Sequence, residues 1–155
     1  MMAGATAGEI FVVARLKDFS NNYSGLVHFG TGYGTIYSAG GVWNDFGTND
    51  EAYYARPTDA VVTQTHLANA SVSIAGESAL RINGVEHVRL EGKSVGFRPD
   101  PAIGIDRYGE AFNGDIAEVM VFDRVLSDEE REQISLYIGQ RYGIGDLIPD
   151  ISSPS

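Results

Sequence analysis

Two carboxylates in one strand-like segment are the first residues in this chain whose spacing could support catalysis. Glycoside hydrolysis requires a pair of carboxyl groups about 5–9 Å apart on the two sides of a sugar-binding cleft. The nearest pair of this kind is Asp115 and Glu118, within the segment Asp-Ile-Ala-Glu. Because successive strand residues alternate between faces, a spacing of three predicts that the two side chains lie on opposite faces. The sequence therefore disfavours a hydrolase.

Other catalytic patterns are also missing from the sequence. The chain has no cysteine, which excludes disulfides, thiolate metal sites and a cysteine nucleophile. His28, His66 and His87 lie in three separate predicted strands and do not have the spacing of metal ligands. No Ser–His–Asp set stands out. We therefore predict that the chain is not an enzyme.

Loop oxygens are the only pattern compatible with a metal ion. Asp45, Asp50, Asp106 and Asn113 are hard donors that suit calcium, but they do not follow an ordered loop pattern such as that of the EF-hand. We predict no cofactor, with calcium left open.

Binding of sugar is better supported, because it uses aromatic faces together with planar amide or carboxylate partners. The residues that supply these groups lie in two stretches of the chain: Trp43, Asn44, Asp45, Tyr53 and Tyr54, and then Arg107 and Tyr108. The alternative is structural, with Trp43 anchoring the core and the tyrosines covering sheet edges. The sugar-binding interpretation predicts a glycan-binding site formed by these side chains.

Charge and hydropathy exclude several kinds of partner. The chain of 155 residues has 11 Lys and Arg against 21 Asp and Glu, which gives a net charge of -10. Such a balance disfavours nucleic acid and anionic lipid, because cationic side chains drive binding to phosphate. The longest apolar run, 10–14, is far shorter than the roughly 20 residues of a membrane span. We predict no nucleic-acid binding and no membrane insertion; the first six residues also lack the pattern of a secretory signal.

The elements that must position these side chains are short strands. Apolar alternation and β-branched residues predict strands at 9–16, 25–30, 35–38, 42–46, 60–66, 102–105 and 114–122, and the stretches 48–59 and 96–101 are predicted to be loops. Asn83-Gly84 between alternating flanks predicts a two-residue hairpin turn within 80–88.

One helix is predicted near the C-terminal end. Ser127 and Glu130 form a capping-box pattern, and an apolar stripe at helical spacing follows at 134–142. Gly143 is placed to end the helix in the left-handed conformation.

About ten strands at a spacing of 8–12 residues predict an all-β fold, a sandwich of two antiparallel sheets with one C-terminal α-helix. Val12-Val13 and the run 119–122 are apolar on both faces, which predicts middle strands covered on both sides.

The C-terminal part of the chain resembles a known family. The stretch from Phe112 to Arg131, with Gly-Asp-Ile-Ala-Glu and Leu-Ser, and the end Arg141-Tyr142-Gly143 resemble the C-terminal signature of laminin-G-like, concanavalin A-like lectin/glucanase domains. The resemblance covers roughly residues 9–144 and implies a jelly-roll β-sandwich used for recognition. Residues 1–8 are then an N-terminal arm and 145–155 a C-terminal tail.

The chain departs from this family at its start. Family members usually carry a further lead-in strand before the position of Glu9, and the first and last strands commonly lie side by side. We therefore expect an open sheet edge near 114–123, through which the chain could pair with another chain as a homo-oligomer.

Three functions follow, in order of preference. The first is a non-catalytic lectin-like attachment module whose partners are glycans or other protein chains, at a cell surface or outside the cell. The second is a structural virion protein, such as a phage capsid decoration or tail component. A glycoside hydrolase is the third.

Overall fold

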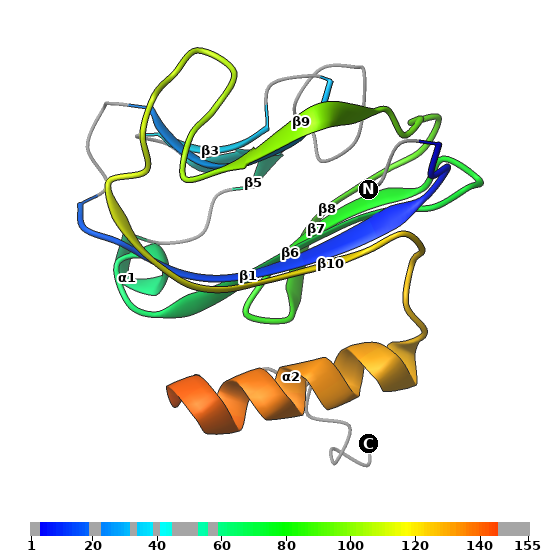
Figure 1. Cartoon of the computed structure of the whole chain (residues 1–155). Coiled ribbons are helices and arrows are strands. Elements are labelled where there is room, and N and C mark those ends of the chain that lie inside the picture. Colours follow the sequence, from blue (N-terminus) through cyan, green and yellow to red (C-terminus); the bar gives the residue numbers. More distant parts are fainter. Residues whose placement is uncertain are drawn as a thin grey trace.

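The computed structural model describes residues 4–18, 23–31, 34–38, 41–44, 53–55 and 59–145. In these residues two antiparallel five-stranded sheets pack face to face, and a C-terminal helix covers the outer face of one sheet (Figure 1). The prediction of a β-sandwich with one C-terminal helix is confirmed.

The first sheet has the order β10 (Gly114–Phe122), β1 (Gly8–Leu16), β6 (His66–Val72), β7 (Ser78–Ile82) and β8 (Val85–Leu90). The second sheet has the order β5 (Tyr53–Ala55), β4 (Gly41–Asn44), β3 (Thr35–Ser38), β2 (Ser24–Gly30) and β9 (Phe97–Ile103). The two helices are α1 (Asp59–Val62) and α2 (Asp128–Tyr142). None of the described helices combines the length and apolarity that a membrane crossing requires.

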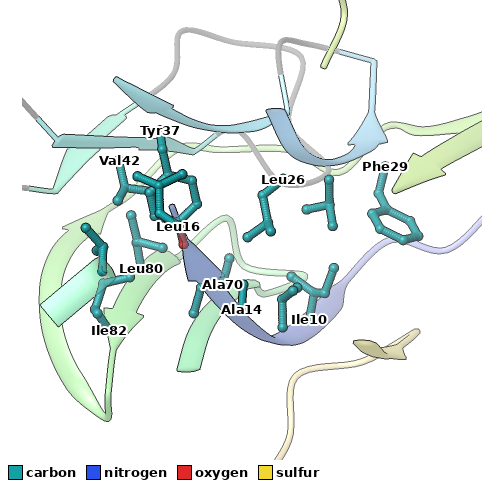
Figure 2. Close-up of a cluster of buried hydrophobic side chains, with 14 of the residues drawn as sticks. Ile10, Ala14, Leu16, Leu26, Phe29, Tyr37, Val42, Ala70, Leu80 and Ile82 are labelled. Carbon is teal, nitrogen blue, oxygen red and sulfur yellow. The ribbon is translucent and has the colours of Figure 1, made fainter. Parts of the chain in front are cut away.

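Strand β1 is buried on both faces, as its sequence predicts. Ile10, Val12 and Ala14 point into the core between the sheets, while Phe11 and Val13 join the cluster under α2. Figure 2 shows the first of these cores, in which side chains of β2 and β3 meet those of β1, β6 and β7. Alternation along one strand thus builds both layers of packing.

The predicted hairpin and helix caps are confirmed. Asn83 and Gly84 both have positive φ, 49° and 77°, and they join β7 to β8. The Ser127 side chain accepts a hydrogen bond from the Glu130 amide, Glu130 bonds back to the Ser127 amide, and Gly143 ends α2 with a φ of 67°.

A buried ion pair attaches α2 to the first sheet. Glu9 of β1 is fully buried, and its two carboxylate oxygens accept from Arg131 at 2.8 and 3.1 Å. The same oxygens also accept from the Asn69 side chain at 2.9 Å and the Leu126 amide at 2.8 Å. Every polar atom of this carboxylate is therefore hydrogen-bonded, as a buried charge requires.

The predicted strand at 60–66 is wrong. Residues 59–62 form the short helix α1, and the strand begins only at His66 and continues to Val72. The β-branched residues of the first segment suggested a strand, but Val62 instead fills the core from a helix. Strand β6, rich in small and polar residues, is buried along its whole length, so tertiary packing overrides local propensity here.

The two predicted loops also contain strands. Strand β9 includes Pro99 and Pro101, which lack an amide hydrogen. These prolines are tolerated because β9 is the edge strand of its sheet. Strand β5 occupies 53–55 within the predicted loop 48–59.

Strand β10 is not a middle strand. It pairs with β1, and no other described strand pairs with its second edge. Its apolar run 119–122 is only partly buried, because α2 and the core cover its faces without a neighbouring strand.

Candidate functional site

The first group of predicted binding residues lies on the edge strand β5 of the second sheet and on its neighbour β4. The backbone register pairs Trp43 with Tyr54 and Asn44 with Tyr53, across β4 and β5. Asp45 lies outside the described residues. The register thus brings four of the predicted residues to adjacent backbone positions.

The second group belongs to the β9–β10 loop, residues 104–113. Asp106 is 4% exposed, and its Oδ1 accepts from the amides of Tyr108 at 2.9 Å and Glu110 at 2.8 Å. These bonds, together with the positive φ of Gly109, hold the tip of the loop so that Tyr108 is 65% exposed. Arg107 is also exposed.

Gly25 at the start of β2 allows this loop to lie close to the sheet. A Cβ atom added at Gly25 would lie 2.6 Å from both Asp106 Cβ and the Ile105 carbonyl carbon, well inside van der Waals contact. The Gly25 amide also donates to the Glu110 carbonyl at 3.3 Å. The absence of a side chain at residue 25 therefore allows the loop to pack directly against the start of β2.

The two groups belong to different strands and loops of the second sheet. The register pairs Trp43 with Ile36 and Ile36 with Gly25, so Trp43 lies level with the end of β2 to which the β9–β10 loop bonds. Strands β2 and β3 separate β4 from β9. The two groups are therefore separated across the strands of the sheet and not along them.

A hollow of about 600 Å³ lies at the same end as the β9–β10 loop. We call it the polar hollow; it is lined by Arg15, Leu16, Lys17, Thr63, Phe112, Asn113, Gly114 and Asp115. It combines a guanidinium, an ammonium, a carboxylate, an amide, a hydroxyl and one aromatic ring. Such a set can donate to and accept from the hydroxyl groups of a sugar.

Hydrogen bonds hold several of these side chains in place. Arg15 Nη2 lies 2.6 Å from the Asp115 carboxylate, and the Asn113 amide side chain donates to Asp18 at 3.2 Å. The Lys17 amide donates to the Asn113 carbonyl at 2.8 Å, which ties the end of β1 to the end of the loop. The two lining segments thus form one wall.

The sequence pattern did not indicate most of this hollow. Arg15 interrupts the otherwise apolar residues 10–16 of β1, and that isolated charge was the available signal. Thr63 gave no signal because its place depends on α1, which the sequence pattern did not predict.

The prediction that Asp115 and Glu118 point to opposite faces is wrong. A register shift between Val13 and Ala14 leaves Ala117 without a partner, so that Glu118 pairs with Val13 and Asp115 with Arg15. Paired residues share a face, and Val13 and Arg15 are two apart, so both carboxylates lie on the outer face.

Both of these carboxylates already have partners. Asp115 pairs with Arg15, while Glu118 accepts from Tyr142 at 2.7 Å and Tyr137 at 3.1 Å. Asp115 therefore forms an exposed ion pair, and Glu118 connects β10 to α2.

A hydrogen bond joins the two sheets near this end of the molecule. The buried Tyr37 hydroxyl lies 2.8 Å from His66 Nε2, and His66 Nδ1 lies 3.0 Å from the Gln64 carbonyl. Because a carbonyl can only accept, Nδ1 donates and Nε2 accepts from Tyr37. Burial lowers the pKa of His66 and raises that of Tyr37, so both are neutral near pH 7.

Within the described residues, no group of three or more His, Asp or Glu side chains is arranged to hold a metal ion. His28, His66 and His87 lie in β2, β6 and β8. Of the loop oxygens suggested for calcium, Asp45 and Asp50 lie outside the described residues.

A second hollow, of about 310 Å³, lies between the end of β10 and α2. Its lining includes Phe122, Leu126, Ile134 and Tyr137 together with the ion pair of Arg124 and Glu130. This apolar hollow adjoins Phe122 at the end of β10, whose second edge pairs with no other described strand.

Comparison with known proteins establishes the fold. No family model matches the chain, and no curated protein sequence matches it. Among solved structures, the chain is similar to the botulinum neurotoxin serotype D binding domain, with a TM-score of 0.68 and 14% identity over 88% of this chain. It is also similar to a Bacteroides ovatus protein described as a "putative carbohydrate binding protein", with a TM-score of 0.67 and 13% identity over 84% of this chain.

A further similar structure is the botulinum neurotoxin serotype D ligand binding domain in complex with N-acetylneuraminic acid, with a TM-score of 0.62 and 12% identity over 85% of this chain. The chain spans only 37%, 41% and 36% of the lengths of these three chains. At this identity the likeness shows the fold alone, a β-sandwich that this chain shares with these binding domains.

Proposed function

We propose that this chain is a non-catalytic, lectin-like recognition module that binds glycan at the polar hollow and the adjacent Arg107 and Tyr108. The observation that carries the proposal is the lining of the hollow, which combines the polar side chains of Arg15, Lys17, Thr63, Asn113 and Asp115 with the ring of Phe112. The similar structures are binding domains, one of them in complex with a sialic acid, which supports the same class of ligand. The resemblance to laminin-G-like domains and a place at a cell surface belong to this proposal.

The two cations of the hollow favour a glycan that carries a carboxylate. The chain as a whole is acidic, with a net charge of -10, yet Arg15 and Lys17 stand together at the end of β1. Arg15 already pairs with Asp115, so Lys17 is the cation that we assign to the ligand. Sialylated and uronate-containing oligosaccharides should therefore bind more tightly than neutral ones.

A glycan array with neutral and acidic oligosaccharides tests this proposal. Lys17→Ala and Asn113→Ala should each weaken binding about tenfold, equivalent to about 1.4 kcal/mol. The matched control is Lys93→Ala, which removes the same charge at the opposite end of the first sheet, beyond β8. Equal losses for Lys17→Ala and Lys93→Ala would overturn the assignment to the hollow, and no binding to any glycan would overturn the function.

The β4–β5 group remains a second proposed surface for the same function. Trp43→Ala and Tyr54→Ala report on it, because these residues are register partners on β4 and β5, and the hollow is lined by residues of other segments. Loss of glycan binding in these variants, with Lys17→Ala unaffected, would move the site to the second sheet. Circular dichroism of each variant shows whether the fold persists.

A structural role in a virion is the alternative function, and one observation favours it. The second edge of β10 has no partner among the described strands, and such an edge can pair with a second copy of the chain. The apolar hollow beside it offers a place for side chains of the added strand. Light scattering coupled to size exclusion tests this: a closed multimer supports it, and a monomer at micromolar concentration contradicts it.

A further inference from the structure

The sequence contains the dipeptide Asn-Gly twice, at Asn83-Gly84 and at Asn113-Gly114. An asparagine followed by glycine can lose its side-chain amide without an enzyme, because the next backbone nitrogen attacks the side-chain carbonyl carbon. Glycine favours this attack, since it has no Cβ to shield the nitrogen and its backbone rotates readily. The rate of the reaction then depends on how firmly the fold holds each asparagine.

The fold holds Asn83 firmly. Its side-chain oxygen accepts from the Leu67 amide at 2.8 Å, and its own amide donates to the Leu67 carbonyl, also at 2.8 Å. Both bonds attach the tight turn between β7 and β8 to the neighbouring strand β6, and Asn83 is half-buried. Rotation of the side chain toward the Gly84 nitrogen would break the first bond, so the reaction at Asn83 requires the turn to open.

Asn113 is exposed, and its side chain is held by fewer hydrogen bonds. Its nitrogen Nδ2 donates to Asp18 at 3.2 Å, whereas its side-chain oxygen accepts no hydrogen bond within the described part of the chain. Because the bond to Asp18 is exposed, water can replace it at little cost. The Asn113 side chain is therefore free to turn toward the next backbone nitrogen.

The Gly114 amide, which is the attacking group, also lies in an open position. The Lys17 amide donates to the Asn113 carbonyl at 2.8 Å. Leu16 and Gly114 are the next register partners, and in an antiparallel ladder this pattern makes them a non-hydrogen-bonded pair. The Gly114 amide therefore points away from β1, toward the second edge of β10, with which no other described strand pairs.

We propose that Asn113 is a site of spontaneous deamidation and that the fold protects Asn83 from the same reaction. The Gly114 nitrogen forms a bond to Cγ of Asn113, the bond between Cγ and Nδ2 breaks, and the proton of the Gly114 amide leaves with Nδ2 as ammonia. Water then opens the resulting cyclic imide. Opening on one side gives aspartate, and opening on the other gives isoaspartate, in which the main chain runs through the former side chain.

Deamidation changes the charge of the polar hollow. It places a carboxylate at residue 113, which already lies beside Asp18 and shares the lining of the hollow with Asp115. The added negative charge repels a ligand that carries a carboxylate and offsets the charge of Lys17. This consequence for glycan binding rests on the proposed function, whereas the reaction itself does not.

Peptide mass spectrometry of the wild-type chain, incubated in a mildly alkaline buffer, tests the proposal. Each conversion raises the peptide mass by the difference between an oxygen atom and an NH group, and fragmentation distinguishes isoaspartate from aspartate. In the folded chain Asn113 should convert about tenfold faster than Asn83, the factor that corresponds to one or two hydrogen bonds. In the chain unfolded by urea, the two rates should become similar. Asn83 is therefore an internal control.

Two results of this measurement would overturn the proposal. One is an equal or faster conversion of Asn83 in the folded chain. The other is conversion of Asn113 in urea alone, which would show that the fold protects this residue as well. Asn113→Gln is the matched variant, because attack on its longer side chain requires a larger and less favourable ring. It should abolish the mass change at residue 113 and leave that at Asn83 as in the wild type.

A separate measurement addresses the consequence for the hollow. Asn113→Asp carries the product side chain from the start, and it should weaken the binding of carboxylated glycans about tenfold. Wild-type binding by Asn113→Asp would overturn the effect of deamidation on the hollow. The rates of conversion are measured without any glycan, so they decide the modification site even if the chain binds none.

Discussion

Two buried carboxylates, Glu9 and Asp106, lie in different regions of this molecule and are satisfied to different extents. Glu9 is fully buried between β1 and α2, and both of its oxygens accept from Arg131 and from further donors. Asp106 is 4% exposed in the β9–β10 loop, and one of its oxygens has no donor. The helix-covered face is therefore a closed structural contact, whereas at the loop end Oδ2 of Asp106 is an acceptor that is available to a ligand.

Breaking the closed contact should have the largest effect. Arg131→Ala leaves the Glu9 carboxylate buried without its cation, and we expect a loss of about 3–5 kcal/mol in the free energy of unfolding. Arg124→Ala removes one partner of an exposed pair with Glu130 and should have little effect on stability, because solvent screens an exposed pair. Urea denaturation of the two variants measures the contrast, and equal losses would show that burial of Glu9 does not matter.

Crowding the loop end should have an intermediate effect. Gly25→Ala places a methyl group against Asp106 and the Ile105 carbonyl carbon, which forces the β9–β10 loop away from β2. Overpacking of this kind costs about 1–3 kcal/mol. We also expect weaker glycan binding, because the loop carries Tyr108. Gly145→Ala is the control, since a Cβ there meets nothing within 4 Å. Wild-type stability and binding in Gly25→Ala would contradict the close packing of the β9–β10 loop against residue 25.

Removing the cap of α2 should be milder. Ser127→Ala deletes the side chain that accepts from the Glu130 amide, at an expected cost of about 1 kcal/mol. The buried pair of Glu9 and Arg131 still holds the helix, so the fold should persist. A denaturation midpoint lowered as far as in Arg131→Ala would show that the cap, and not the ion pair, holds α2.

The smallest effect near neutral pH belongs to His66, which lies between the sheets. Its pKa is lowered in the folded state, so the unfolded chain takes up a proton first as the pH falls below about 6.5. Stability contributed by neutral His66 is therefore complete above that pH and is lost progressively below it. Comparing the pH dependence of unfolding in wild type and His66→Gln isolates this contribution, and identical profiles would contradict it.

Local signals in the sequence predicted several elements closely. Asn83-Gly84 requires two positive φ angles, Ser127 and Glu130 cap each other, and Gly143 ends the helix, each within a few residues of chain. The segment 114–122 was likewise predicted with its observed bounds. Such features depend on neighbours in sequence, and so the sequence alone determined them.

The tertiary structure decided the remaining features. Strand β6 is a strand because it is buried between β1 and β7, and β9 tolerates two prolines because it lies at a sheet edge. Arg15 and Asp115 meet across strands a hundred residues apart, and the bulge at Ala117 reversed the predicted face of one carboxylate. Composition and turn chemistry determined the β-sandwich with its capped helix. Pairing between distant strands determined where the proposed ligand-binding groups meet, since no local sequence pattern specifies long-range register.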